Sequence, residues 1–360
     1  MTTQAGAVRT QFRGLQALRF VAASSVVLHH SLLYAHERLD SSVPVWGIGA
    51  VELFFAISGF VAVVATRGFR ARSDGWKYYI VRRGIRILPM YWVATTVKLA
   101  VLIVAPAAVL HATLDWGMVA RSYVLLPSVN IDGDIAPLLG VAWTLLFETF
   151  FAVVFMLALV IGWRPVLVTG IILSLCALGG LLRPAEFDPM LIYFDPRLIY
   201  YILGLVVGVY AAKRSAWLFV AGMVWVYALH FILQPTRLDS LIRITVIAAL
   251  LIFVMLAEKQ LERLPQLFVT LGNGAYSLYL FHPLIAPAVP AAFAVIGLQV
   301  GWLAVVGSVA VAILASVLLY RFAEDPVTRW LQRVLPYGGR PPRPASAQHP
   351  PSAVEEGAHR

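Results

Sequence analysis

Charged residues and cysteine are scarce in this chain. Of its 360 residues 13% are charged, with 18 Asp and Glu against 28 Lys and Arg. Soluble domains carry about 25% charged residues, so the composition excludes an ordinary soluble protein. The one cysteine, Cys176, lies in an apolar run and has no partner for a disulfide or a thiolate metal site. We expect it to serve packing, and we expect no metal.

Apolar sequence is what the chain has in abundance. Hydrophobic residues make up 60% of it, and the mean hydropathy is +0.82. Apolar runs of about 20 residues are long enough to cross a bilayer as helices. The pattern predicts an all-α fold, a polytopic membrane helical bundle of about ten transmembrane helices. The expected spans are 15–35, 46–66, 84–106, 140–162, 165–182, 196–213, 215–233, 240–257, 267–292 and 301–322.

The segments outside the spans indicate domains and orientation. We expect residues 1–14 to be a cytoplasmic N-terminal segment without a cleavable signal, 15–335 the membrane domain, and 336–360 a disordered Pro-rich cytoplasmic tail. Basic residues between spans mark the inner side of a membrane. The loop after the second span is basic and residues 107–139 are acidic, which predicts cytoplasmic termini in a bacterial plasma (inner) membrane. The net charge of +10 then reflects orientation, and no nucleic acid partner is expected.

The first span carries a cation near one end and histidines at the other. His30 follows Arg19 by eleven positions, about three turns plus 20°, so both lie on one helix face about 16 Å apart. His29 lies about 80° from that line. The alternative is a simple anchor whose arginine snorkels to the inner interface. Of the two histidines, His30 is the one that we expect to work with Arg19.

Four ionisable residues fall in the outer half of their spans by residue count: His30, Glu52, Glu148 and His282. Such groups cost about 2.5 to 3.5 kcal/mol at mid-span and usually face a cavity or a partner. Their similar depth predicts one polar chamber. The alternative is that the two glutamates only pair with the histidines and hold helices together.

A second polar level lies near the inner face. Arg82, Arg83 and Arg86 precede residues 87–89 around the start of the third span, and Arg19 lies near the same level. Arginines at inner helix ends are also the ordinary orientation signal. The shared face of Arg19 and His30, however, links a cationic inner mouth to the outer chamber. A ligand with an anionic head and a reactive tip, such as acyl-coenzyme A, would fit between them.

Six short motifs in this order resemble the integral-membrane acyltransferase-3 family, over about residues 15–330. They are Arg19 with His30, then 49–60, 82–92, 143–151, 276–283 and 324–326. Residues 140–145, at the start of the fourth motif, are similar to the form of that motif in the exopolysaccharide O-acetyltransferase branch of the family. The chain has Glu52 where aspartate is common and Thr144 where serine is common, and both changes keep the carboxylate or hydroxyl.

The resemblance implies transfer of an acyl group, most often acetyl, from cytoplasmic acyl-CoA (acetyl-CoA) to a hydroxyl of a surface or secreted carbohydrate or glycolipid. His30 would be the general base, with Glu148 orienting its imidazole or stabilising the charged form. Guanidinium forks suit phosphate oxygens. The implied site therefore adds coenzyme A-binding arginines at Arg19, Arg82, Arg83 and Arg86, and supporting residues at Glu52, His282, Ser58 and Tyr276.

A different class remains open on the sequence. A proton-coupled transporter or flippase could use the same buried histidines and carboxylates as a proton relay. Many transporters are built from internal repeats, and this sequence has no convincing repeat, which weakens that alternative. Whether an acyl-histidine intermediate forms also stays open.

Overall fold

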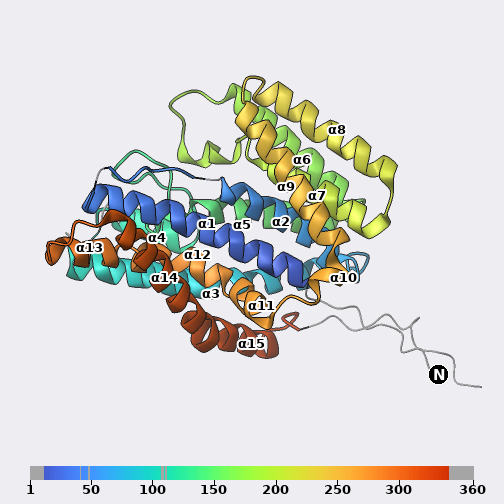
Figure 1. Ribbon diagram of the computed structural model, residues 1–360. Coiled ribbons are helices and arrows are strands. Elements are labelled where there is room, and N and C mark those ends of the chain that lie inside the picture. The colour runs from blue at the N-terminus through green and yellow to red at the C-terminus, as the bar shows by residue number, and fades with distance from the viewer. Residues whose placement is uncertain (1–11, 41, 48, 107–108, 110–111, 340–360) are drawn as a thin grey trace, which may run out of the picture.

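A computed structural model describes residues 12–40, 42–47, 49–106, 109 and 112–339 of the chain. This part is a bundle of helices without a named strand (Figure 1), and the predicted all-α polytopic fold is confirmed. The main helices are α1 (Arg13–Arg38), α2 (Ala50–Thr66), α3 (Gly75–Val104), α4 (Trp116–Tyr123), α5 (Trp143–Ile161), α6 (Pro165–Gly179), α7 (Leu198–Lys213), α8 (Ala216–Leu233), α9 (Leu238–Leu256), α10 (Glu258–Leu261), α11 (Gln266–Asn273), α12 (Ala275–Ile285), α13 (Ala288–Val295), α14 (Gly301–Leu319) and α15 (Asp325–Val334).

A helical segment lies at each of the ten expected spans. In the described residues, eight segments are long and apolar enough to cross a membrane by length and composition. The other two are α2, which is apolar but has 17 residues, and α1, which has 26 residues. At 1.5 Å per residue α1 is about 39 Å long, so its length suffices. Its arginines and histidines make it less apolar than the other spans.

Two expected spans differ from the structure. The third begins at Gly75, nine residues before the expected start, because the helix continues through the arginines that the sequence placed in a loop. The ninth is broken into α11, α12 and α13. Gly274 separates the first two pieces and Pro287 precedes the third, and both residue types interrupt helices.

The helices form two groups that meet at α2 and α5. Helices α6, α7, α8 and α9 gather on one side, while α1, α3, α12 and α14 lie on the other (Figure 1). Helix α1 packs on α11, α12 and α14, and α2 packs most extensively on α7. The cavity described below lies between the two groups.

The packing of α2 on α7 depends on two glycines. A Cβ at Gly59 would overlap the carbonyl oxygen of Tyr201, and one at Gly204 would overlap that of Ala56. Small residues let membrane helices approach to backbone contact. This close crossing brings Ser58, next to Gly59, and Tyr201 to the same point inside the bundle.

Candidate active site

A cavity of about 1150 Å³ separates the two groups of helices. Its walls come mainly from α1, α2, α3, α5, α7 and α12, and it extends along α2 from Val51 to Arg67, the residue just after that helix. That stretch is about 24 Å at 1.5 Å per residue. Small-molecule sites usually measure about 300 to 1,000 Å³, so this cavity has room for a large, elongated ligand.

Six arginines line the cavity. All four arginines predicted to bind coenzyme A line it, and so do two whose place in the sequence had indicated only orientation. These residues are Arg19, Arg82, Arg83, Arg86, Arg67 and Arg214. The side chain of Arg86 is exposed, whereas Arg19 is 9% exposed and donates to the side-chain oxygen of Gln16 at 3.2 Å. Several guanidinium groups can therefore reach a ligand in the cavity.

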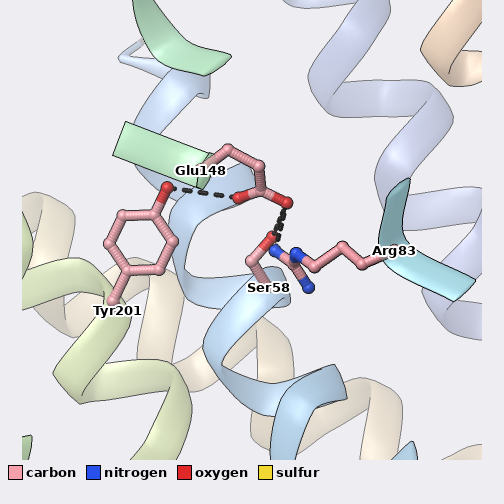
Figure 2. Close-up of polar contacts among 4 residues, drawn as sticks. All are labelled: Ser58, Arg83, Glu148 and Tyr201. Atoms are coloured by element: carbon pink, nitrogen blue, oxygen red, sulfur yellow. Dashed lines mark hydrogen bonds and ion pairs between the residues drawn. The ribbon is translucent and has the colours of Figure 1, made fainter. Parts of the chain in front are cut away.

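An ion pair between Arg83 and Glu148 forms the polar centre of the cavity wall (Figure 2). The two side chains are 12% and 19% exposed. Ser58 donates a hydrogen bond to Glu148 Oε1 at 2.8 Å, and Tyr201 donates to Oε2 at 3.2 Å. The guanidinium group of Arg83 also lies over the Phe151 ring, 5.5 Å from its centroid. One carboxylate therefore joins α2, α3, α5 and α7.

This geometry differs from the predicted role of Glu148 beside His30. No contact between the two residues occurs in the described structure, because α5 packs on α2, α3 and α6 and does not pack extensively on α1. Arg83, assigned to coenzyme A, instead has Glu148 as its ionic partner. If Arg83 binds a phosphate as predicted, its guanidinium group must contact the phosphate and the Glu148 carboxylate at the same time.

The structure brings His30 and His282 together, with their ring centroids 5.0 Å apart. His282 is fully buried, and its Nδ1 lies 2.7 Å from the carbonyl oxygen of Tyr279. That oxygen would normally accept from the backbone four residues later, but Pro283 has no N–H group. Because a carbonyl only accepts, Nδ1 of His282 must carry the proton. Its Nε2 is left with a lone pair and no partner among the described residues.

The histidine pair borders the cavity at Tyr279. The Tyr279 ring lines the cavity and lies 6.0 Å from the His282 ring and 5.7 Å from that of Phe54. Its hydroxyl group is fixed by Thr144 and by the carbonyl of Val141, each at 2.7 Å. Neither histidine lines the cavity itself. A reactive group in the cavity must therefore pass the Tyr279 side chain to reach the two histidines.

The remaining predicted residues lie apart from the histidines. Glu52 faces Arg243 of α9 at 3.6 Å, at the start of α2. Tyr276 lines the cavity and donates to the carbonyl of Ile87 at 2.7 Å. Of the four ionisable residues predicted to share one chamber, the described structure brings only His30 and His282 into contact with each other. Residue counting gave their depth but not their direction around each helix.

Two polar side chains, Tyr201 and Glu324, make hydrogen bonds that were not predicted from the sequence. Tyr201 lies in an apolar run that gives no signal of its bond to Glu148. Glu324, part of the last motif, is 7% exposed and accepts from Ser277 at 2.6 Å. It ends a π-helical turn, a feature that is frequent at functional sites, and the two motifs that contain Ser277 and Glu324 were the available signal.

Comparison with known proteins agrees with the motifs. A family model described as an acyltransferase domain, Acyl_transf_3, matches residues 12–321. The chain is 31% identical over 279 residues to the exopolysaccharide production protein ExoZ of Rhizobium meliloti (strain 1021), which covers 74% of this chain and 85% of that protein. No solved structure matches the chain described here. Residues from five of the six motifs line one cavity, and the family model covers most of the sequence, so the chain belongs to the acyltransferase-3 family.

Proposed function

We propose that this protein moves an acyl group, acetyl in the first instance, from cytoplasmic acyl-CoA to a hydroxyl of a surface or secreted carbohydrate. Membership of an acyltransferase family supports the class of reaction. The observation that carries the proposal is one elongated cavity that is lined by several arginines and by Tyr279, whose ring contacts the buried His282 beside His30. The similarity to a protein named for exopolysaccharide production supports a carbohydrate acceptor.

The donor would lie along α2. Phosphate groups of coenzyme A would bind at Arg86, Arg82 and Arg19, with Arg67 and Arg214 as further cations in the cavity lining. Guanidinium forks bind phosphate oxygens through paired, charge-assisted hydrogen bonds. The pantetheine arm would extend past the aromatic residues of α2 toward Tyr279. No resident metal or further cofactor is part of the proposal.

The chemical step needs a base at the acceptor hydroxyl. His30 would take the hydroxyl proton while the oxygen attacks the thioester carbonyl carbon. The carbon–sulfur bond then breaks, and the imidazolium returns the proton to the coenzyme A thiolate. The Nε2 lone pair of His282 makes that residue the second candidate for the base. An ester and free coenzyme A are the products.

The function is tested with purified full-length protein, acyl-CoA and a carbohydrate acceptor. We expect acyl ester on the acceptor and an equal amount of free coenzyme A. A transporter or flippase would instead move its cargo across vesicles in response to a proton gradient without consuming acyl-CoA. Proton-driven uptake without any turnover would contradict the proposed function.

The donor site predicts a loss of affinity in two variants. Arg86→Ala and Arg19→Ala each remove charge-assisted bonds to phosphate, which are worth about 1.5 to 3 kcal/mol, so we expect donor binding to weaken about ten- to a hundredfold. Lysine at either position should restore part of it, because the charge remains and the fork is lost. Calorimetric titration with coenzyme A measures the effect. Unchanged affinity in both alanine variants would move the donor elsewhere.

The proposal places the protein in a bacterial inner membrane with both termini in the cytoplasm. The arginine-rich wall of the cavity would then open toward cytoplasmic acyl-CoA, as the excess of basic residues in the segment after α2 suggests. A cysteine introduced at Ser73, after replacement of Cys176, should resist an impermeant thiol reagent in intact cells. Labelling from outside would reverse the orientation.

A further inference from the structure

Glu52 is a carboxylate in the first turn of α2 that the proposed acyl-transfer step does not use. Its side chain is 14% exposed, and its Oε1 lies 3.6 Å from Nη1 of Arg243 in α9. Arg243 also donates to the carboxylate of Asp239, one turn earlier in the same helix. One guanidinium group therefore joins two carboxylates where α2 and α9 begin, and these three residues form the Arg243 group. Ionisable groups in spanning segments normally pair with a partner or mark a ligand path.

The ion pairs leave Arg243 partly exposed and partly without hydrogen bonds. Its side chain is 34% exposed and that of Asp239 is 55% exposed, so the Arg243 group is not sealed between the two helices. The buried Nε–H group of Arg243 has no hydrogen-bond partner in the part of the chain that the structure describes. Leaving a buried donor unpaired is costly, and the oxygen of a bound hydroxyl group would satisfy it.

The backbone beside the Arg243 group approaches closely because the residue there is a glycine. Gly49, the residue before α2, has a φ of 65°, in the left-handed region that glycine adopts without steric cost. A Cβ at this position would lie 2.7 Å from Cδ of Arg243 and 3.2 Å from Oε2 of Glu52. Any other residue would therefore push the guanidinium group away from Glu52.

The segment before α2 places the Arg243 group at the same end of the bundle as the two histidines of the site. A Cβ at Gly47 would lie 3.0 Å from Nδ1 of His29, and the rings of His29 and His30 are 5.3 Å apart. Consecutive Cα atoms are 3.8 Å apart, so Gly47 and Gly49 are separated by at most about 8 Å. Val51, in the same turn of α2, lines the donor cavity. A short saccharide can therefore contact the Arg243 group and His30 at the same time.

We propose that the Arg243 group binds a neutral sugar unit of the acceptor while a neighbouring unit presents its hydroxyl to His30. Carboxylates accept hydrogen bonds and guanidinium groups donate them, so the group offers both kinds of partner that adjacent sugar hydroxyls need. Two carboxylates against one guanidinium group leave an excess of negative charge, and like charges at a binding site are unfavourable. A uronate at this position is therefore disfavoured. The inference rests on the proposed acyl transfer and narrows its acceptor.

The test measures acyl transfer by the full-length protein in nanodiscs to three forms of one oligosaccharide: neutral, and with a uronate on one or the other side of the acylated unit. The wild-type protein should show a higher KM for one uronate form than for the neutral form. In Arg243→Gln the KM for the neutral form should rise about ten- to a hundredfold, the effect of losing hydrogen bonds to a charged group. The KM for acyl-CoA should not change. Asp239→Asn, at an exposed position, removes a negative charge and should lower the KM for the disfavoured uronate form.

Arg329→Gln provides the matched control, because Arg329 and Asp325 of α15 form the same kind of pair four residues apart, and it should leave all KM values unchanged. An Arg243→Gln protein that unfolds at a lower temperature but keeps its acceptor KM would show that the pair only holds α2 against α9. Equal KM values for the neutral and both uronate forms in the wild-type protein would overturn the inference without any variant. In both cases continued transfer keeps the proposed function, whereas no transfer to any acceptor overturns that function as well.

Discussion

His30→Ala is expected to abolish acyl transfer while coenzyme A still binds. General acid–base catalysis contributes about 10² to 10⁴ in rate, and kcat should fall by a factor in that range. Donor affinity should persist because His30 lies outside the arginine-lined cavity, beside His282. Steady-state kinetics and coenzyme A titration on the same preparation measure the two effects.

His29 provides the matched control for this variant. It is the adjacent imidazole, and its Nδ1 contacts the backbone carbonyl of Trp46 at 2.9 Å. His29→Ala therefore makes the same change of side chain on another side of α1, and most activity should remain. Near-normal turnover in well-folded His30→Ala would rule out His30 as the base. His282→Ala, which removes the free Nε2 lone pair, would then be the variant to measure.

Removing either member of the Arg83–Glu148 pair should be the most damaging change to the fold around the cavity. Loss of one partner leaves an uncompensated buried charge, at a cost of about 3 to 5 kcal/mol. Arg83→Met also leaves the Glu148 carboxylate, which accepts hydrogen bonds from Ser58 and Tyr201, without its ionic partner. We expect this variant, and Glu148→Gln, to lower the apparent unfolding temperature in detergent and to reduce transfer severely.

The double variant Arg83→Met with Glu148→Leu separates stability from chemistry. Replacing a buried ion pair by apolar side chains of similar size is often neutral or stabilising, so the unfolding temperature should recover. If the pair also positions groups for transfer, turnover stays low in the recovered protein. Full activity in the stable double variant would show that the ion pair only holds the helices together. An unchanged unfolding temperature in Arg83→Met would show that the pair does not stabilise the fold either.

The helices could be predicted because apolar runs leave a direct signal. The pattern located a helical segment at every expected span, including α1 with its arginines and histidines. The start of α3 could not be predicted from charge, since Arg82 and Arg83 line a cavity and continue the helix inside the bundle. Whether an arginine lies in a loop or faces an internal space depends on helices far along the chain.

The sequence predicted which residues belong to the candidate site much better than which of them contact one another. The motifs named His30, His282 and Glu148, but helix periodicity fixes only the relations within one helix. The meeting of His30 with His282, and of Glu148 with Arg83, depends on which helices are neighbours. The His282–Pro283 step is a local feature with a readable consequence, because the proline itself frees the carbonyl that fixes the histidine tautomer.

The glycine crossing of α2 and α7 has a consequence for motion. Backbone atoms already touch at Gly59 and Gly204, so these helices cannot slide or separate without losing that contact, and they should behave as one rigid body. Donors with longer acyl chains must then be accommodated from the opposite wall, by displacement of α1 and α12. Amide hydrogen exchange with and without coenzyme A should accordingly change in α1 and α12 and remain slow in α2 and α7, and faster exchange of α2 on binding would show that the pair opens.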